Sequence, residues 1–453
     1  MKIIIAGIGK VGFTLAQNLS EEGHDITVID LRDDAIRRAS EVLDVLCIKA
    51  NAASITSLKD AGVESCDVFI AVTDRDELNM VCCLTAKKLG AGYTAARIRD
   101  FDYASEIDRL KKELDIDLVI NPEHAAASHI SRLLRFPAAT NIDTFYRGRI
   151  ELVSFLVREG DVIAGIPLAS LNRGIFDAQI LFCAVERDQN ISIPNGSTVF
   201  SPGDKVYVIG DSVNISRFFR SIRRIEAKVK DAFIVGGGRI GIYLASSLIA
   251  MNIGVKIVES DSRKCREYTE ILPKALIING DGTDYELLLS ENVQESESFV
   301  ALTDSDENNL IVSLYARQLG VKKTVAKINR QNYFGISGLL GIDSIVSPKE
   351  ITAFYILKSI RALQNVHGSR MEALYRIADG SVEAAEFSVT ASTRGLGTPI
   401  RDLKFKPNVL IAVIARKGRF IIPKGTDHME TGDGVIVITR DMQITDLSDI
   451  FSD

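Results

Sequence analysis

The sequence predicts an α/β protein with two doubly wound parallel sheets, each followed by a small α+β lobe, in a tandem duplication. Up to about residue 136, short apolar runs alternate with helical patterns, which is typical of a parallel sheet covered by helices. After Pro137, apolar and polar residues alternate with period two, which indicates a small antiparallel unit. From Asp231 the whole order is repeated.

Paired motifs at one offset support the duplication. The glycine run that begins at Gly7 recurs at Gly236, 229 residues later (236 minus 7), and Asp30 recurs as Glu259 at the same offset. Such pairs along the whole length indicate duplication of a two-domain unit. The predicted domains are a first parallel lobe, a first small lobe, a second parallel lobe and a second small lobe, over residues 1–136, 137–225, 226–365 and 366–453.

The chain opens with a strand, a glycine turn and a helix. The strand is expected over Lys2–Ala6, and Gly7, Gly9 and Gly12 follow it before a helix over Phe13–Glu22. The first glycine allows a tight turn, the second lets the backbone approach a pyrophosphate, and the third lets the helix pack closely on the sheet. The helix N-terminus offers N–H groups and a positive dipole to phosphates. The alternative is a glycine turn used only for packing.

The remaining elements of the first half follow in order. Strands are expected over residues 25–30, 45–48, 67–72, 94–98 and 117–120, and helices over 76–89, 103–114 and 123–135. The last helix opens at Pro122 and is stopped by Pro137, so we expect it to cross over and leave the sheet. In the small lobe, turn sequences near Pro194 and Pro202 precede a final strand over residues 205–209.

Charged residues accompany both glycine runs. Asp30 and Glu259 each end a strand and are placed to accept hydrogen bonds from an adenosine ribose, where a carboxylate disfavours a 2′-phosphate. Lys10 follows Gly9, and Arg239 follows Gly238, the corresponding glycine of the second run. A cation at this position can reach a di- or triphosphate. The alternative for the two cations is a solvated residue at a helix start.

The halves differ after their third strands. The second half has Gly280-Asp-Gly-Thr283, which is expected to place the carboxylate of Asp281 and flexible backbone beside an adenine pocket. The first half has Lys49-Ala-Asn-Ala-Ala53, which keeps a polar group in Asn51 but has no glycine. We therefore expect two unequal pockets, with the fuller set of contacts in the second half.

The sequence Thr-Asp-x-Asp-Glu-x-Asn ends the fourth strand in both halves, at Thr73–Asn79 and, 230 residues later (303 minus 73), at Thr303–Asn309. Three explanations stay open. Asp74 and Asp304 could cap the following helix, the acidic residues could form a metal cluster, or the loop could line the ribose–phosphate side of a nucleotide.

Arg97 and Lys327, near the end of the fifth strand, either complete a phosphate or partner-subunit contact or are surface charges. No metal ligand and no catalytic residue is predicted. The candidate nucleotide-binding residues are Gly7, Gly9, Lys10, Val11, Gly12, Asp30, Asn51, Thr73, Asp74, Arg97, Gly236, Gly238, Arg239, Ile240, Gly241, Glu259, Gly280, Asp281, Thr303, Asp304 and Lys327.

Composition excludes several classes of protein. A net charge of −6 argues against a nucleic-acid binder, which needs a basic face. No apolar run approaches the length of about 20 residues that a spanning helix needs, and no leader sequence is expected at the N-terminus. The six cysteines show no CxxC spacing, and adjacent Cys82 and Cys83 fall on an expected helix. Free thiols in a reducing cytosol are therefore expected.

A catalytic set is not visible. A dehydrogenase needs an acid/base and a substrate anchor over the nicotinamide, yet no histidine lies between Asn141 and Arg224, and His428 has no counterpart in the first half. We therefore expect the nucleotide to be a ligand and not a reactant. A duplicated NAD-dependent dehydrogenase is the alternative.

Taken together, the two glycine runs with their acidic strand ends, Gly280-Asp-Gly-Thr283 and the two Thr-Asp-x-Asp-Glu-x-Asn sequences resemble the tandem regulator-of-potassium-conductance (RCK, also called KTN) family. The resemblance covers essentially the whole chain, with each Rossmann-like lobe followed by a TrkA-C lobe. It implies a regulatory subunit, without covalent chemistry, that gates a Trk-type potassium uptake transporter in response to NAD(H) or ADP/ATP.

The resemblance also implies partners and a location. The partner would be an integral membrane potassium-translocating subunit of the TrkH or KtrB kind, and the chain itself would form a homo-oligomeric ring, a tetramer, at the cytoplasmic face of the cell membrane. A nucleotide-sensing adaptor for some other transporter remains a third interpretation. The small lobes of the family can hold a further ligand, and the sequence does not indicate one here.

Overall fold

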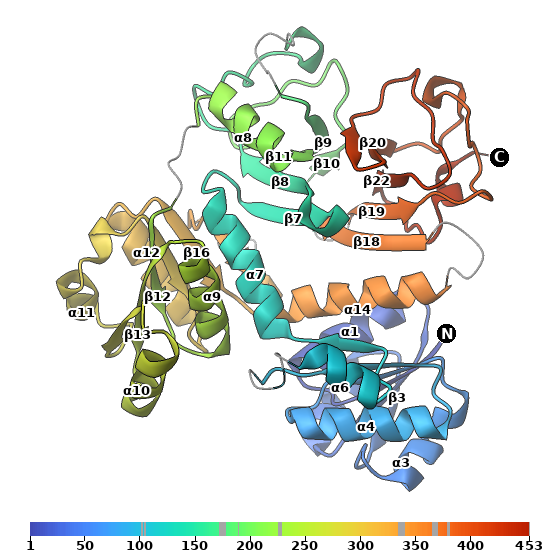
Figure 1. Ribbon diagram of the computed structural model, residues 1–453, viewed down its shortest axis with the longest axis vertical. Helices are drawn as coiled ribbons and strands as arrows, with labels where there is room; N and C mark the ends of the chain where they lie inside the picture. The colour runs from blue at the N-terminus through green and yellow to red at the C-terminus, as the bar shows by residue number, and fades with distance from the viewer. Residues whose placement is uncertain are drawn as a thin grey trace.

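The computed structural model contains four sheets arranged as two pairs (Figure 1). Two six-stranded parallel sheets form the parallel lobes, and two five-stranded antiparallel sheets form the small lobes. The predicted fold class is confirmed, while the limits of the four units stay a prediction. The structure describes residues 1–452 except 101–102, 104–105, 172–177, 189, 225–228, 334–339, 365–369 and 378–380.

The first parallel lobe has the strand order β3-β2-β1-β4-β5-β6, which reverses between β1 and β4. Buried Ile3, Ile4 and Ile5 make β1 a central strand covered on both faces. Its elements are β1 (Lys2–Ala6), α1 (Lys10–Glu21), β2 (Asp25–Asp30), α2 (Asp33–Val42), β3 (Leu46–Lys49), α3 (Ile55–Asp60), β4 (Val68–Ala71), α4 (Asp76–Leu89), β5 (Tyr93–Arg97), α6 (Ile107–Glu113), β6 (Leu118–Ile120) and α7 (Pro122–Arg135).

The second parallel lobe repeats this order as β14-β13-β12-β15-β16-β17. Its elements are β12 (Asp231–Val235), α9 (Arg239–Ala250), β13 (Gly254–Glu259), α10 (Ser262–Ile271), β14 (Leu276–Asn279), α11 (Tyr285–Ser290), β15 (Ser298–Ala301), α12 (Asp306–Gln318), β16 (Lys323–Lys327), β17 (Ser344–Val346) and α14 (Pro348–Gln364). The helix expected over 103–114 is described from Ile107, and part of its expected start lies outside the described residues.

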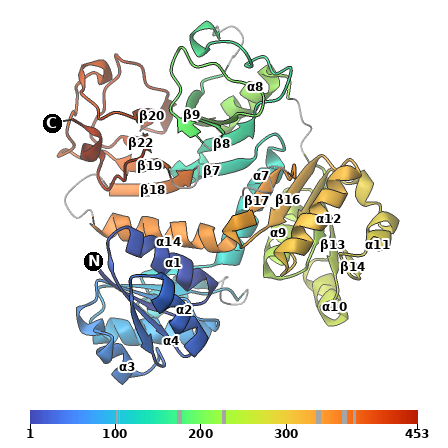
Figure 2. The ribbon, with the colours of Figure 1, turned by 180° about the vertical axis from the view of Figure 1, so that it is seen from behind.

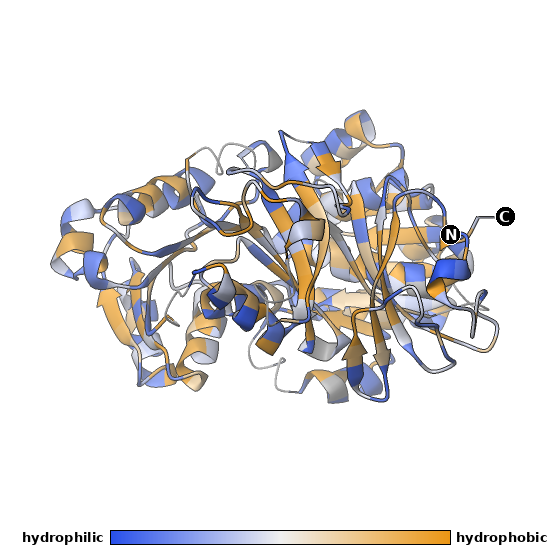
Figure 3. Cartoon of the chain, turned by 90° about the horizontal axis from the view of Figure 1, so that it is seen from above, coloured by the Kyte–Doolittle hydropathy of each residue, from blue (hydrophilic) through white to orange (hydrophobic). Residues whose placement is uncertain are grey.

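The small lobes share one antiparallel strand order, β7-β8-β11-β9-β10 in the first and β18-β19-β22-β20-β21 in the second. Figure 3 colours the chain by hydropathy, and its strands carry both hydrophobic and hydrophilic residues. Their elements are β7 (Asn141–Phe145), β8 (Ile150–Leu156), β9 (Leu181–Arg187), β10 (Asn190–Ser192), β11 (Lys205–Asp211), α8 (Ser212–Ser221), β18 (Arg370–Ile377), β19 (Val382–Ser388), β20 (Val409–Arg416), β21 (Arg419–Ile421) and β22 (Gly434–Arg440).

The last helix of each parallel lobe packs on the other parallel lobe. Helix α7 leaves the first sheet, as the sequence predicts, and lies along α9, while α14 of the second lobe lies along α1 (Figure 2). The apolar cores follow this exchange. One continuous core joins α7 and the first small lobe to the second parallel lobe, and another joins α14 and the second small lobe to the first. The two halves are therefore interlocked.

The two small lobes also contact each other, side by side in both views. The Tyr375 hydroxyl donates a hydrogen bond of 2.6 Å to the Thr144 carbonyl, and the Tyr146 amide donates one of 2.9 Å to the Glu386 carboxylate. Tyr146 also lies directly over Gly434, where a Cβ would stand 1.4 Å from its hydroxyl oxygen. This interface requires glycine at position 434 because a side chain there would displace the tyrosine.

Candidate functional site

The candidate site of each lobe lies where the strand order reverses. In the first lobe the glycine loop after β1 and the Thr-Asp loop (Thr73–Asn79) after β4 meet at the carboxyl edge of the sheet. An ideal Cβ on Gly7 would stand 2.8 Å from the Thr73 amide nitrogen, so the two loops touch. Ligands of doubly wound sheets bind outside this edge at this switch point.

The three glycines of the first loop have different physical roles. Gly7 has φ +96° and Gly12 would place a Cβ 1.9 Å from the Gly7 carbonyl oxygen, so the loop itself requires both. Gly9 has ordinary φ −69°, and the nearest atom to its ideal Cβ is 3.9 Å away. The fold therefore tolerates a side chain at Gly9, and its surface is open to a ligand. The second loop repeats this pattern, with nothing within 4 Å of the ideal Cβ of Gly238.

The helices that follow start without a side-chain cap. Gly9 and Gly238 are the N-cap residues of α1 and α9, so no side chain satisfies the first amide groups of either helix. Lys10 and Arg239 are exposed at the first helical position. A positive charge there is unfavourable next to the positive end of the helix dipole, unless an anion lies beside it. Val11 and Ile240 are buried, so they can offer a nucleotide only their backbone.

The acidic strand ends hold the glycine loops in shape. Asp30 accepts hydrogen bonds from the amides of Ile8 (2.8 Å) and Arg32 (2.9 Å). Glu259 accepts them from Gly237 (3.0 Å) and Asp261 (2.9 Å). Asp30 Oδ2 and Glu259 Oε2 each accept one of these bonds and keep a second lone pair, so a ribose hydroxyl can still bind there.

The order of residues that the two Thr-Asp loops share has a structural cause. The buried Asn79 amide oxygen accepts from the Thr73 backbone amide (2.8 Å) and hydroxyl (2.7 Å), and its NH₂ donates to the Arg97 carbonyl (2.9 Å). Asn309 makes the same three bonds in the second lobe, to Thr303 and Lys327. The asparagine therefore joins the ends of the fourth and fifth strands.

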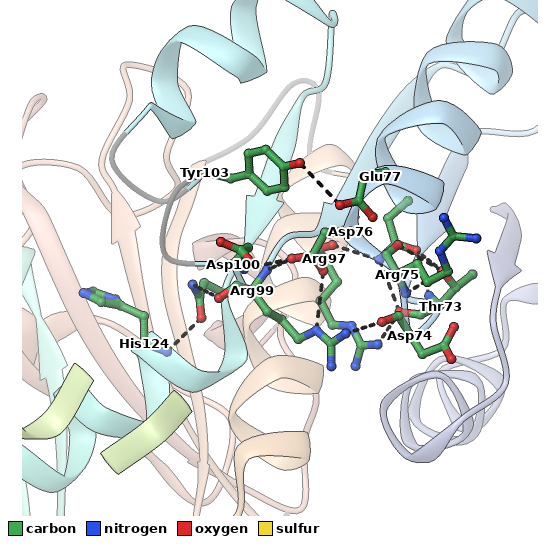
Figure 4. Close-up of polar contacts among 12 residues, drawn as sticks. Thr73, Asp74, Arg75, Asp76, Glu77, Arg97, Arg99, Asp100, Tyr103 and His124 are labelled. Carbon is green, nitrogen blue, oxygen red and sulfur yellow. Dashed lines mark hydrogen bonds and ion pairs between the residues drawn. The ribbon is translucent and has the colours of Figure 1, made fainter. Parts of the chain in front are cut away.

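The expectation that Asp74 and Asp304 cap the following helices is wrong. The N-cap positions are Arg75 and Ser305, and Asp304 is fully exposed. The buried acid of the loop is Asp76, whose carboxylate accepts from the amide of Arg99 at 2.7 Å (Figure 4). No described group of His, Cys, Asp and Glu residues could hold a metal ion, so the described part of these loops forms no metal cluster.

The cations at the fifth strands fold back onto the Thr-Asp loops. The Arg97 guanidinium donates to the Thr73 carbonyl, and burial lowers the pKa of Arg97 to about 10 (Figure 4). The Lys327 ammonium lies 3.4 Å from the Asp304 carboxylate. Arg97 is therefore a half-buried part of the site edge and not a free surface charge.

Gly280 and Gly282 each have a packing role, and the expected contact of this loop with an adenine pocket stays a prediction. A Cβ on Gly280 would stand 2.4 Å from Leu287 Cδ2, and one on Gly282 would stand 2.2 Å from Val235 Cγ1. Asp281 closes its own turn by accepting from the Thr283 amide (2.9 Å) and hydroxyl (2.8 Å). Asn51 closes the corresponding turn in the first lobe.

Sequence reasoning missed one pair of residues beside the glycine loops. Arg32 is the N-cap residue of α2, makes no cap bond, and extends its guanidinium to 3.9 Å from the ideal Cβ of Gly9. The corresponding residue in the second lobe is Asp261, which caps α10 by accepting from the Arg263 amide at 2.8 Å. An arginine is a poor cap, and this mismatch with helix chemistry was the available signal.

Comparison with protein families agrees with this geometry. The chain matches the TrkA-N domain over residues 3–122 and 232–348, and the TrkA-C domain over residues 152–223 and 384–452. The chain belongs to the TrkA family. The resemblance to tandem RCK proteins that the sequence predicts is confirmed.

Relatives in this family match along their whole length. The Trk system potassium uptake protein TrkA of Halomonas elongata is 33% identical over 456 residues, covering 100% of this chain and 98% of the relative. The TrkA homolog of Archaeoglobus fulgidus is 32% identical over 457 residues, covering 100% of both chains.

Solved structures share the fold at lower identity. The GsuK channel bound to NAD has a TM-score of 0.64 and 17% identity, covering 97% of this chain and 76% of that one. The GsuK RCK domain has a TM-score of 0.64 and 18% identity, covering 97% and 92%. Among the described helices of this TrkA-family chain, none has the length and apolarity to cross a membrane.

Proposed function

We propose that this chain is the nucleotide-sensing regulatory subunit of a Trk-type potassium uptake system. In this proposal it acts at the cytoplasmic face of the cell membrane and gates a potassium-translocating subunit of the TrkH or KtrB kind. The observation that carries the proposal is the paired glycine and Thr-Asp loops at both switch points, each above a helix with uncapped amide groups. The relatives' names as Trk potassium uptake proteins support the transport role.

The proposed ligands are adenine nucleotides, NAD(H) and ADP/ATP, bound for regulation and not for turnover. Neighbouring structures include a GsuK channel with NAD and a GsuK with ADP, which supports nucleotide binding in general. In this proposal the predicted site residues hold the ribose at Asp30 or Glu259 and the phosphates at the glycine loop. The alternative function is that of a dehydrogenase, which would require a small lobe that presents an acid/base to the nicotinamide.

The two sites are proposed to prefer different nucleotides because their charges differ. The first has Lys10 and Arg32 beside its loop, and Arg99 behind it. In the second site, Asp261 stands in place of Arg32 and Asn329 in place of Arg99, so a carboxylate and an amide replace two cations. The first site is therefore suited to the more highly charged ADP and ATP, and the second to NAD(H).

The proposed assembly is a homo-oligomeric ring, a tetramer. Val81 on α4 and Ile311 on α12 support self-association, because they stand at the same position of equivalent helices and are 48% and 50% exposed. Contiguous exposed apolar patches mark protein–protein contact surfaces. The double substitution Val81→Glu and Ile311→Glu should lower the mass measured by light scattering. An unchanged mass would contradict a role of these two residues in self-association.

Calorimetric titration of the full chain with NAD, NADH, ADP and ATP tests the proposal. Gly9→Ala and Gly238→Ala are the matched variants, because the structure has room for both methyl groups while each blocks the approach of a phosphate. We expect each variant to keep the parent's melting temperature and to lose binding at one site. Full binding in both variants, or none in the parent, contradicts the nucleotide sites.

The regulatory role is tested by potassium flux. The chain is added to vesicles that contain the membrane subunit, and the flux should change with nucleotide by a factor consistent with a coupling of about 1–3 kcal/mol. A potassium flux that changes neither when the chain is added nor when nucleotide is added contradicts regulation. Reduction of NAD with hydroxy acids that is lost in Gly9→Ala would instead favour the dehydrogenase.

A further inference from the structure

A buried arginine locks the junction between the first parallel lobe and the second small lobe. Arg361 on α14 is 1% exposed and is gripped by two carboxylates. Its Nε donates to Glu22 Oε2 at 3.1 Å, and its Nη1 and Nη2 donate to Glu383 at 2.9 and 3.0 Å. Glu22 ends α1, so the triad joins three separate elements.

The equivalent junction in the other half lacks one carboxylate. Arg135 stands 13 residues after Pro122, as Arg361 stands 13 after Pro348, and it pairs with the fully buried Glu151, the counterpart of Glu383. The residue that ends α9, in the place of Glu22, is Met251. Among the described residues, Arg135 donates only to Glu151, and its Nε has no partner.

A cavity occupies the space beside this incomplete junction. Its volume is about 390 Å³, and it is lined by Leu134, Arg135, Val229, Lys230, Met251, Asn252 and Ile253. The Arg135 side chain is 37% exposed, whereas Arg361 is almost fully enclosed. Arg135 and Met251, which replaces the second carboxylate, therefore both line this cavity.

We propose that this cavity is a binding site for a small organic anion, whose carboxylate takes the position that Glu22 occupies in the other half. Arg135 supplies a planar fork that suits a carboxylate. Lys230 supplies a second cation, and Leu134, Val229 and Ile253 supply apolar contacts for a short carbon chain. A short dicarboxylate fits this arrangement best.

The charge around the cavity supports an anion. Arg132 lies one turn before Arg135, and burial lowers the pKa of Arg132, while Tyr375, Asp143 and Glu151 act to raise it and the charge of Arg135 acts to lower it. Glu151 is the one carboxylate that the structure shows paired with Arg135. In the other half, Arg361 is paired with two carboxylates. A bound anion would give Arg135 a second carboxylate as well.

The ligand would brace the contact between helix α7, the end of α9 and strand β8. These elements belong to the first parallel lobe, the second parallel lobe and the first small lobe, so an anion there would favour the arrangement in which the three are packed together. This effector site is separate from both glycine loops, and its occupancy does not depend on the proposed function.

Titration of the full chain with succinate, followed by calorimetry and thermal unfolding, tests the proposal. Met251→Glu supplies the missing carboxylate from the chain itself, and Met251→Gln is the control of equal size without charge. We expect saturable binding of one succinate per parent chain, at least about tenfold weaker binding in Met251→Glu, and only a small change in Met251→Gln. Met251→Glu should also melt at a higher temperature.

Other outcomes overturn the proposal. No saturable binding by the parent up to about 10 mM succinate excludes a specific site. Equal binding by the parent and Met251→Glu places the anion elsewhere, and equal loss in both variants attributes the effect to size and not charge. Lys230→Ala should weaken succinate more than acetate, and inorganic phosphate that binds more tightly than either acid would refute the preference for carboxylate.

Discussion

Reversing the charge of Arg32 should convert the first nucleotide site toward the chemistry of the second. The guanidinium stands 3.9 Å from the ideal Cβ of Gly9, above the amide groups expected to hold phosphates. Arg32→Asp replaces an attractive charge by a repulsive one at the position where the second lobe has Asp261. The substitution also supplies a helix cap of the kind that α10 has, so we expect the fold to be kept.

The magnitude follows from Coulomb's law. At about 5 Å in a water-like dielectric, one unit charge on another is worth about 0.8 kcal/mol. The side chain of Arg32 is 58% exposed, so this lower limit applies rather than the value for a buried pair. Reversal changes two units of charge, so ADP should lose about 1–2 kcal/mol, or about five- to thirtyfold in Kd. NAD, with less charge, should lose less.

Calorimetry on the full chain gives the measurement. The second site is silenced by Gly238→Ala, so that only the first site reports, and each titration is repeated at high salt, where the difference should shrink. Arg32→Gln is the intermediate control and should lose about half as much. An unchanged ratio of ADP to NAD affinity in Arg32→Asp would refute the argument from charge. Asp261→Arg should have the opposite effect at the second site.

Three further perturbations test the packing and the buried charges. Glu22→Gln should destabilise the chain by about 1.5–3 kcal/mol in urea unfolding, because it weakens a charge-assisted contact to buried Arg361; an unchanged midpoint contradicts this. Gly237→Ile should cost about 1–3 kcal/mol, because the ideal Cβ stands 2.8 Å from Tyr268 Cε2 and 3.1 Å from Glu259 Oε2, and a second change, Tyr268→Ala, should show a favourable coupling with it in a double-mutant cycle. Burial raises the pKa of Asp143 to about 7, so the native state holds a proton that the unfolded state releases, and stability should fall from about pH 4 to 7. Asp143→Asn should remove that contribution, seen as a flatter unfolding free energy over this range than in the parent.

The parallel lobes could be predicted from the sequence because their signals are local. The run of isoleucines in Lys2–Ala6, followed by Gly7 and Gly12, specifies a buried strand and a tight turn, and the structure uses both glycines in that way. Pro122 likewise marks the start of a helix that leaves its sheet. Because the second half repeats the motifs of the first, the same prediction applies to it, and its sheet has the same strand order.

The errors arose where a residue's role depends on neighbours distant in the sequence. The packing roles of Gly280 and Gly282 depend on Leu287 and Val235, which no local pattern identifies. Asp74 is an ordinary N-cap type, yet the helix starts two residues later. Arg32 lies outside the motif itself, so only the folded turn brings it over the glycine loop.

In the proposed function, exchange of the final helices connects the two nucleotide sites. Tyr243, one turn into α9 from the second glycine loop, accepts a hydrogen bond of 3.1 Å from Asn121 and donates one of 3.3 Å to the Arg99 carbonyl. Asn121 begins α7, and Arg99 follows β5 at the Thr-Asp loop of the first lobe. A nucleotide that shifts the start of α9 therefore moves residues that shape the other site. Such coupling must be reciprocal, so ADP at the first site should change NAD affinity at the second by the same factor as the reverse, and Tyr243→Phe should reduce both factors equally.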